Sequence, residues 1–218
     1  MPYISTEQAG DSNLCAFLDM IAWSEGTDSA VHPLTKMNGY DVIVTGSSGP
    51  EIFSDFRHHP FSNGRAAKHV TGSLFSSASG RYQFLRTHWH HYRDLLKLPD
   101  FGPLSQDLWA IQLITERRAL EYIRTHRIRE AISLCANIWA SFPGAGYGQP
   151  EHQMDQLIVV FEASLQKLNL PPLIVDETEY DVPDPANILS ELIELKNETR
   201  KIRQLLEYHF ASAEQNSE

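Results

Sequence analysis

The side chain best placed for chemistry is Glu25, which ends an apolar stripe near the start of the chain. The spacing from Leu14 to Leu18, Ile21 and Glu25 is four, three and four residues, so on a helix all four side chains share one face. Gly26 follows directly and is the residue type most often found just past a helix end, which predicts Glu25 in the last turn. The negative end of the helix dipole and the apolar neighbours both raise the pKa of a carboxyl there. A raised pKa is what a general acid needs at neutral pH.

The ordinary alternative is a glutamate that borders the helix end in solvent. Perturbed carboxylates mark functional sites only statistically, so periodicity alone favours this exposed glutamate. Further features of the chain must decide between the two.

A second stretch suited to ligand binding is Pro143–Pro150, which holds three glycines and one tyrosine, Tyr147. Glycine at this density excludes a helix interior. The segment is either a flexible connector or a loop that brings its backbone and the Tyr147 ring close to a ligand.

Histidines are the remaining candidates for chemistry, as metal ligands. His58 and His59 are adjacent, and His88 and His91 form an i, i+3 pair on one helical face. No cysteine or clustered carboxylate completes a ligand set at a recognisable spacing. The sequence therefore favours surface histidines and predicts no metal and no cofactor.

The elements that must position these residues are mostly helical. A first helix is expected at residues 12–25, and later apolar patterns predict helical structure from Arg81 onward, including a helix that opens at Ser105. Further helices are expected within residues 127–140 and 151–168. Three tryptophans fall on these stripes and are assigned to the core: Trp89, Trp109 and Trp139.

Between the first helix and Arg81, interleaved glycine, serine and β-branched residues predict a small β-region. Residues 39–45 are typical of a strand, residues 46–50 of a turn and residues 51–54 of a return strand. A further short strand is expected near residues 77–79.

The composition is that of an ordinary globular protein, with 42% hydrophobic and 21% charged residues among 218. The net charge of −10 is concentrated in residues 171–218, which hold 11 Asp and Glu against 4 Lys and Arg. An acidic tail on a nearly neutral body argues against nucleic-acid partners and against adhesion to anionic lipid.

Compartment and redox state follow from what the sequence lacks. No apolar run approaches a membrane span, and the N-terminal residues lack the basic start and apolar core of a signal peptide. We therefore expect the protein to stay in the cytoplasm in which it is made. Cys15 and Cys135 both fall in apolar helical patterns, which favours two free buried thiols over a disulfide.

The chain divides into a globular body of residues 1–170, a Pro-rich acidic linker of residues 171–186 and an amphipathic C-terminal helix of residues 187–218. The last part has a coiled-coil-like seam, interrupted once by threonine. Self-association into a homo-oligomer is the favoured interpretation, and the alternatives are a helix that folds back on the body or one that is only marginally ordered on its own. The seam consists of Ile188, Leu192, Leu195, Thr199, Ile202 and Leu206.

Taken in order, the helix ending in Glu25, the β-region, a Gly-Arg-Tyr-Gln segment, further helices and the glycine-rich loop resemble the lambda-type phage endolysins. The resemblance spans roughly residues 14–168, and its most specific blocks surround Glu25 and end at Gln149. It implies an α+β, lysozyme-like fold that is mainly helical, with the small β-region forming one side of a glycan cleft. The matching segments are Phe17–Asp28, Gly39–Val44, Phe53–Asp55 with His59-Pro60, Gly80–Gln83 with Leu85, Asp100–Phe101 with Ser105–Asp107, and Asn137–Gln149.

The resemblance also implies roles for single residues. Glu25 matches the catalytic glutamate of the family, in the same Trp-Ser-Glu-Gly-Thr-Asp setting. Tyr82 and Gln83 match a segment that lines the floor of the glycan cleft, and Tyr147 matches the tyrosine of a loop that closes over the glycan. The opposite lip, at about residues 61–75, is the least similar part, and no binding residue is transferred to it.

The activity that the resemblance implies is lytic transglycosylation of peptidoglycan for host cell lysis. Glu25 alone would cleave the bond between N-acetylmuramic acid and N-acetylglucosamine and leave a 1,6-anhydro product. The alternatives are a hydrolytic muramidase, which needs a second carboxylate such as Asp28, Asp41 or Asp55, and a non-catalytic wall-binding protein. Passage from the host cytoplasm to the periplasmic peptidoglycan would depend on a phage holin.

Overall fold

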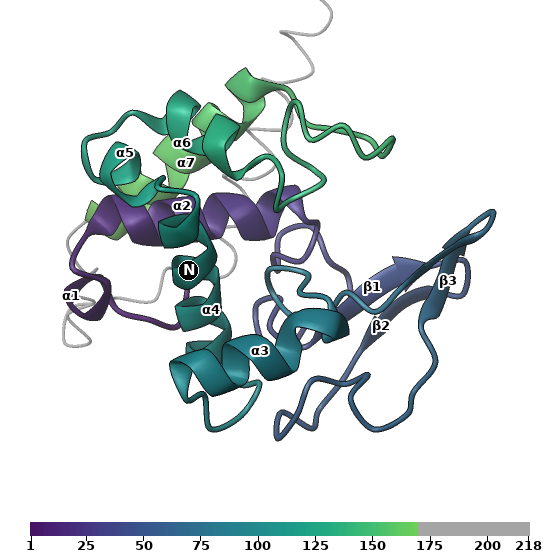
Figure 1. Ribbon diagram of the computed structural model, residues 1–218. Coiled ribbons are helices and arrows are strands. Elements are labelled where there is room, and N and C mark those ends of the chain that lie inside the picture. The colour runs from purple at the N-terminus through teal and green to yellow at the C-terminus, as the bar shows by residue number, and fades with distance from the viewer. Residues whose placement is uncertain (170–218) are drawn as a thin grey trace, which may run out of the picture. The chain divides into compact units, whose positions relative to one another are not determined.

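The computed structural model describes residues 1–169, in which helices surround a central helix and two short hairpins extend to one side (Figure 1). The linker predicted at residues 171–186 and the helix predicted at residues 187–218 lie outside the described residues. The elements are, in chain order, α1 (Thr6–Ala9), α2 (Ser12–Ser24), β1 (Val42–Gly46), β2 (Gly49–Ile52), β3 (Lys68–Thr71), β4 (Leu74–Ser76), α3 (Arg86–Leu96), α4 (Pro103–Glu116), α5 (Leu120–Arg124), α6 (Ile128–Cys135) and α7 (Met154–Asn169).

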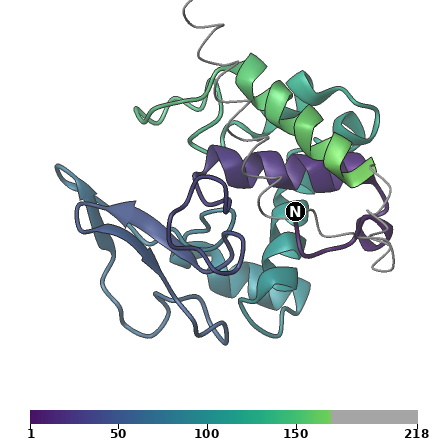
Figure 2. The ribbon, with the colours of Figure 1, turned by 180° about the vertical axis from the view of Figure 1, so that it is seen from behind.

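Helix α2 is the centre of the helical part, and α7 packs along it (Figure 2). Asp11 caps its first turn by accepting a 2.8 Å hydrogen bond from the Asn13 backbone N–H. Ten of its 13 residues are buried, among them Leu14, Leu18 and Ile21. The predicted apolar face is confirmed, but burial extends almost all round the helix because α1, α5 and α7 each pack against it.

An aromatic cluster packs α3 and α4 together. Trp89 and Trp109 are each 1% exposed, and their ring centroids are 5.9 Å apart. Phe84 stacks on Trp109 at a centroid distance of 4.0 Å. Trp139 is also buried, so the assignment of all three tryptophans to the core is confirmed.

The β-region consists of two antiparallel hairpins, β1–β2 and β3–β4. The first agrees with the strand, turn and return strand expected over residues 39–54. The expected strand near residues 77–79 is wrong in place, because the last strand ends at Ser76 and Ser79 makes only isolated bridges to Ile43 and Phe84. The β3–β4 hairpin was not predicted, since its short strands are only half-buried or exposed and carry no clear alternation of apolar residues.

Helical structure begins later than Arg81, at Arg86. The residues before it form a turn in which Gln83 has a left-handed backbone, with φ of 51°. Such a conformation cannot continue a right-handed helix. The short helices α1 and α5, of four and five residues, were not predicted because they contain too few turns to show a periodic pattern.

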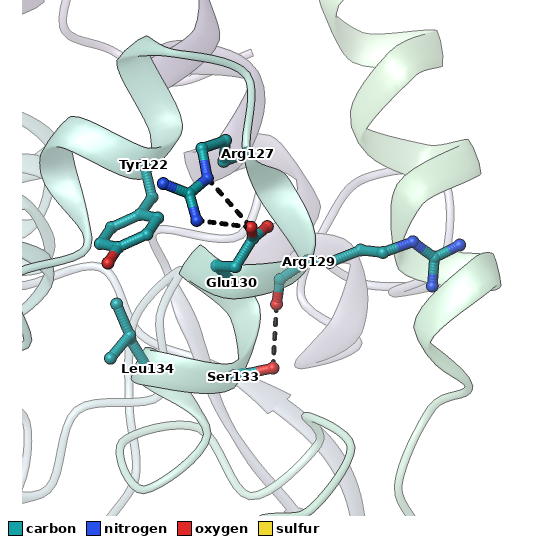
Figure 3. A pocket seen from close by; sticks show the side chains of 6 residues that line it. All are labelled: Tyr122, Arg127, Arg129, Glu130, Ser133 and Leu134. Atoms are coloured by element: carbon teal, nitrogen blue, oxygen red, sulfur yellow. Dashed lines mark hydrogen bonds and ion pairs between the residues drawn. The ribbon is translucent and has the colours of Figure 1, made fainter.

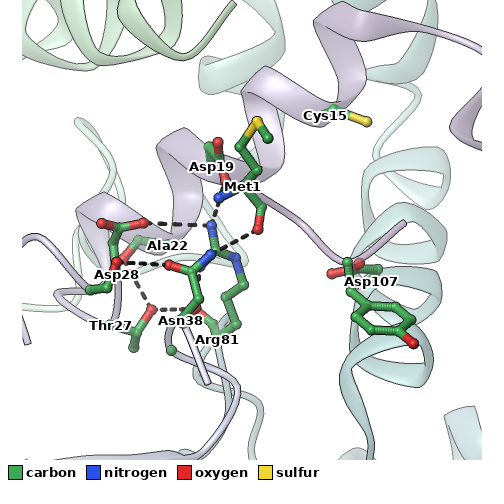
Figure 4. Close-up of polar contacts among 12 residues, drawn as sticks. Met1, Cys15, Asp19, Ala22, Thr27, Asp28, Asn38, Arg81 and Asp107 are labelled. Carbon is green, nitrogen blue, oxygen red and sulfur yellow. Dashed lines mark hydrogen bonds and ion pairs between the residues drawn. The ribbon is translucent and has the colours of Figure 1, made fainter. Parts of the chain in front are cut away.

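Buried charges hold this turn against α2 (Figure 4). The Arg81 side chain is fully buried, and its guanidinium donates a 2.5 Å hydrogen bond to Asp19 and lies 3.7 Å from Asp28. It also donates to the Asn38 carbonyl oxygen. A buried guanidinium requires such partners, because an unpaired charge in the interior is strongly destabilising.

Both cysteines are free and buried, which confirms that prediction. Burial raises the pKa of the Cys15 thiol to about 11, where it is not reactive at neutral pH. Among residues 1–169, no helix is long and apolar enough to cross a bilayer.

Candidate active site

Glu25 lies directly after α2 as its C-terminal capping residue, one position beyond the predicted last turn. Its backbone N–H still donates to the Ile21 carbonyl at 2.9 Å. Gly26 then adopts a φ of +67°, which a residue without a side chain reaches at little cost. The chain leaves the helix at that point, so the Glu25 side chain stands at the end of a rigid element.

The turn after Glu25 is fixed by contacts from two other segments. The Thr27 hydroxyl lies 2.6 Å from the Arg81 carbonyl oxygen and 3.0 Å from the Ala22 carbonyl oxygen. Gly39 passes so close that a Cβ there would lie 2.7 Å from the Thr27 carbonyl oxygen. These contacts explain why this turn follows α2 with a defined direction.

The Glu25 carboxyl is half-buried, and in the described part of the chain its hydrogen-bond partner is Ser141. Ser141, which follows α6, donates from its hydroxyl to Glu25 Oε1 at 2.6 Å. Burial raises the pKa of Glu25 from 4.5 to about 7, although the Ser141 hydrogen bond lowers it. In a substantial fraction of the protein molecules, Glu25 is therefore protonated near neutral pH, as general acid catalysis requires.

Sequence reasoning missed Ser141, although it lies inside the specific block Asn137–Gln149. Serine is too common in loops for its type alone to mark a site, and its partner is 116 positions away. Only the fold brings α2 and the segment after α6 together.

The glycine-rich loop begins and ends beside Glu25. The His152 backbone N–H donates to the Ser141 carbonyl oxygen at 2.8 Å, which joins the two ends of the loop. The His152 ring packs on Trp23 at a centroid distance of 4.7 Å, and its Nε2 lies 3.1 Å from the Ser24 carbonyl oxygen. Tyr147 is 56% exposed within the loop.

The two residues predicted on the cleft floor differ from each other. The Tyr82 side chain is 1% exposed, and its hydroxyl donates to Asp107 at 2.6 Å inside the core. Because it is buried, its ring offers no surface to a glycan, which disagrees with the predicted contact. The prediction failed because a Tyr-Gln motif does not reveal which of its two side chains points inward. Gln83 is half-buried and donates from its side chain to the Gly80 carbonyl oxygen at 3.0 Å.

The three candidate second carboxylates each have a structural partner. Asp41 is buried and accepts hydrogen bonds from the Thr35 hydroxyl and, at 2.9 Å, from the Lys36 backbone N–H. Asp55 is exposed and forms a 2.6 Å ion pair with Arg57.

Asp28 lies on the turn that follows Glu25. It accepts a 2.8 Å hydrogen bond from the Ala30 backbone N–H and lies 3.7 Å from the Arg81 guanidinium. These contacts are typical of a carboxylate that stabilises a loop.

The endolysin family, as a sequence profile, matches residues 15–168 of this chain. The endolysin of Escherichia phage P2 is 59% identical over 167 residues, which cover 75% of this chain and 97% of that protein. The endolysin of Escherichia phage lambda is 51% identical over 147 residues, which cover 67% and 87%. The chain belongs to the endolysin family. It is thus a phage enzyme of the class that degrades peptidoglycan for lysis.

Solved structures confirm the lysozyme-like, α+β fold. The lysozyme of bacteriophage lambda in complex with a chitohexasaccharide aligns with a TM-score of 0.65 at 49% identity. A second structure of the lambda lysozyme aligns with a TM-score of 0.62 at 47% identity. Each alignment covers 71% of this chain and 94% of the solved chain.

The histidines of this endolysin are not all on its surface, and that prediction is wrong for His59. His59 is fully buried, with Nε2 2.9 Å from the Phe84 carbonyl oxygen, and burial lowers its pKa to about 4. Its neighbour Pro60 and the aromatic residues around it gave no periodic pattern from which burial could be predicted. His88 and His91 are exposed on α3, as expected.

A shallow cavity of about 370 Å³ lies elsewhere on the endolysin, on α5 and α6 (Figure 3). Its charged side chains are already paired, with Arg127 2.8 Å from Glu130 and Arg129 in contact with Asp155. None of the predicted site residues belongs to it. The lining residues are Tyr122, Arg127, Arg129, Glu130, Ser133 and Leu134.

Proposed function

We propose that this chain cleaves the β-1,4 bond between N-acetylmuramic acid and N-acetylglucosamine by lytic transglycosylation, with Glu25 as the single acid and base. The observation that carries the proposal is the state of Glu25. It is a half-buried carboxyl at a fixed helix end, with a pKa of about 7 and a serine hydroxyl on one oxygen. Such a group can both give and take a proton at neutral pH.

In the first half of the reaction, the protonated Glu25 transfers its proton to the glycosidic oxygen, and the bond from that oxygen to C1 of the muramic acid breaks. In the second half, the ionised Glu25 removes the proton from the 6-hydroxyl of the same sugar, and that oxygen attacks C1. The product is a 1,6-anhydro ring, Glu25 is protonated again, and no water is consumed. An intramolecular nucleophile reacts at a high effective concentration, so a second carboxylate is not needed.

The positions of the other carboxylates support this route over hydrolysis. A hydrolase needs a second carboxylate as nucleophile or as base for water. Asp41 and Asp55 are held by the contacts described above, and Asp28 is held by the Ala30 N–H beside the Arg81 guanidinium. Each of these three aspartates therefore has a structural role that explains its presence without a part in catalysis.

Gln83 and Tyr147 are the residues that we assign to glycan binding. Tyr147 supports this assignment by its exposure and by its place in a loop whose end, Ser141, donates to Glu25. An aromatic ring in that position can pack against the apolar face of a sugar. The lambda lysozyme, whose fold this chain shares, was solved with a chitohexasaccharide bound. For Tyr82 we propose instead a structural role through Asp107.

Access to the substrate completes the proposal. We infer that the protein reaches the periplasmic peptidoglycan after release from the cell interior, and that a holin opens the inner membrane for it. The absence of a membrane-spanning helix among residues 1–169 is compatible with this dependence.

Mass spectrometry of the muropeptides released from purified walls tests the function. Wild type is expected to release fragments with 1,6-anhydro ends, and Glu25→Gln, which is isosteric but cannot transfer the proton, is expected to release almost none. Reducing ends in place of anhydro ends would show a hydrolase. No release by wild type would contradict the proposed cleavage and favour the wall-binding alternative. Activity of Glu25→Gln within about tenfold of wild type would contradict the role of Glu25, because general acid–base catalysis contributes about 10²–10⁴-fold.

A further inference from the structure

The glycine-rich loop has three glycines in the left-handed backbone conformation, and its Ala145 N–H donates to the Phe142 carbonyl oxygen at 3.2 Å. Gly144, Gly146 and Gly148 have φ values of +82°, +74° and +70°, and no atom lies within 4 Å of a Cβ built on any of them. The glycines are therefore needed for the left-handed backbone and not for close packing. Three glycines in five residues also lose much conformational entropy when the loop becomes ordered. We therefore expect residues beyond the loop to stabilise it through hydrogen bonds.

The Glu151 side chain accepts two such hydrogen bonds. The Glu151 carboxylate accepts hydrogen bonds from two loop amides, Oε2 from the Gly144 N–H and Oε1 from the Gly146 N–H, both at 2.8 Å. Each of the two carboxylate oxygens therefore accepts a hydrogen bond from a backbone N–H, and these bonds lower the pKa of Glu151. Hydrogen bonds to an ionised acceptor are roughly twice as strong as neutral ones, and two from one group fix an orientation as well as a distance.

The remaining contacts connect this arrangement to Glu25 and to the loop's tyrosine. The Tyr147 hydroxyl donates to the Asn137 carbonyl oxygen at 2.8 Å, and Tyr147 directly follows Gly146, one of the two residues whose amides Glu151 binds. The residue after Glu151 is His152, whose backbone N–H donates to the Ser141 carbonyl oxygen. Glu151 thus links the segment next to Ser141, the donor to Glu25, with the glycines that precede Tyr147.

We propose that Glu151 is a positioning residue for glycan binding, whose carboxylate holds the Gly144 and Gly146 amides so that Tyr147 is presented to the substrate. The inference rests on the proposed function, in which Tyr147 contacts the glycan. Loss of the carboxylate leaves the Glu25–Ser141 pair in place and removes two of the hydrogen bonds that restrict the loop backbone, so the loop becomes more variable in conformation. A larger part of the binding energy is then spent on ordering the loop, so KM rises while kcat changes little.

A competing role for Glu151 is that of the second catalytic carboxylate of a hydrolase. The two roles predict different kinetics. Loss of a positioning residue raises KM, whereas removal of a catalytic base lowers kcat. The observed geometry favours positioning, since both oxygens are occupied by loop amides.

The experiment compares Glu151→Gln with wild type and with Glu162→Gln, a control on α7 whose carboxylate contacts His126 and no loop amide. The glutamine retains one acceptor and turns an N–H₂ group toward the second amide. Hydrogen exchange of the Gly144 and Gly146 amides, followed by NMR, is expected to accelerate at least tenfold in Glu151→Gln and to stay unchanged in the control. On uncrosslinked glycan strands, KM is expected to rise about tenfold with kcat within twofold of wild type, as for the loss of one to two charged hydrogen bonds.

Unchanged amide exchange in Glu151→Gln would overturn the inference, as would a loss confined to kcat. The exchange measurement needs no substrate, so it tests the ties even if wild type fails to cleave glycans, a result that would contradict the proposed function instead. If Glu151→Gln does not fold, Glu151→Asp, which is one methylene shorter and reaches fewer amides, is expected to give the same exchange and KM changes in reduced size. Wild-type exchange in a folded Glu151→Asp protein would equally contradict the proposal.

Discussion

At the scale of single residues, Glu25 shows a conflict between stability and function. Its pKa is about 7 because burial disfavours the charged form by more than the Ser141 hydroxyl favours it. The folded protein therefore binds a proton at this position more tightly than the unfolded chain does. That difference makes the stability of the protein depend on pH through this one carboxyl.

Glu25→Gln is expected to stabilise the protein at high pH and not at low pH. Between pH 4.5 and about 7 the unfolded chain loses the Glu25 proton while the folded protein keeps it, so wild-type stability falls as pH rises through this interval. The glutamine variant has no ionisable group at this position and so lacks this pH dependence of stability. Urea unfolding is expected to show equal stability at pH 4 and an advantage of about 1–2 kcal/mol for the variant at pH 8, less than the full linkage value because Glu25 is partly accessible to water. An advantage that is the same at both pH values would contradict the raised pKa.

Ser141→Ala is expected to move the alkaline limit of activity upward. The Ser141 hydroxyl donates to Glu25 and favours its ionised form, so its loss raises the pKa of Glu25 further. Because the first step of the proposed reaction needs protonated Glu25, the descending limb of the pH–rate profile is expected at higher pH in this variant. Ser133→Ala is the matched control, since Ser133 is exposed on α6 and its hydroxyl donates, among residues 1–169, only to the Arg129 carbonyl oxygen. An unmoved or downward-shifted limb in Ser141→Ala would show that the serine does not act on Glu25.

At the scale of elements, the glutamate that we propose as catalytic depends on one helix and one loop that lie far apart in sequence. Helix α2 presents Glu25 at its end, and the segment after α6 brings Ser141 to it. The ties of His152 to Ser141 and of Glu151 to the glycines make the loop a continuation of that site. A change within the loop is therefore expected to affect binding before it affects the fold.

Much of this arrangement could be predicted from sequence, and the exceptions have physical reasons. Helix α2 and the loop were predictable because a long apolar period and a dense run of glycines are strong local signals. The β3–β4 hairpin was not, because its strands are short and partly exposed. Tyr82 and His59 are buried through contacts with distant partners, Asp107 and the Phe84 carbonyl, and such tertiary contacts leave no local pattern.

The two tyrosines of the predicted site are expected to give opposite effects. Tyr147→Ala removes an exposed ring from a surface loop, so KM on glycan strands is expected to rise severalfold while the melting temperature stays within about 2 °C of wild type. Tyr82→Phe removes a buried donor to Asp107 and is expected to cost about 1–3 kcal/mol of stability while KM is unchanged. Thermal melts and steady-state kinetics on both variants check the pair. A large loss of stability in Tyr147→Ala would place that ring in the core.

At the scale of the whole molecule, the part that belongs to the endolysin family and the part that carries most of the net negative charge are different. The family match covers residues 15–168, whereas the 11 Asp and Glu of the last 48 residues lie beyond it. All the residues assigned to catalysis, glycan binding and loop positioning lie within the matched part. We therefore expect residues 171–218 to add a property that cleavage of the glycan does not require.

We expect that property to be self-association. The seam from Ile188 to Leu206 offers five apolar positions around Thr199, and about three heptads are near the lower limit for a stable coiled coil. The full chain is therefore expected to form a concentration-dependent dimer, and a chain truncated after Leu170 to be a monomer. Light scattering at several concentrations measures the mass of both, and clearing of purified walls measures their activity.

The truncated chain is expected to keep wall-clearing activity within about twofold of the full chain, because it retains every residue of the family match and a proline-rich linker separates the two parts in sequence. Leu195→Glu in the full chain isolates the role of the seam, since a charge at a core position opposes coiled-coil pairing while the length of the chain is kept. Ser190→Glu, at a position outside the seam, is its control and is expected to leave the dimer intact. A monomer mass for the full chain at high concentration would disprove self-association. A truncated chain that folds but does not clear walls would show that the last 48 residues take part in catalysis or binding.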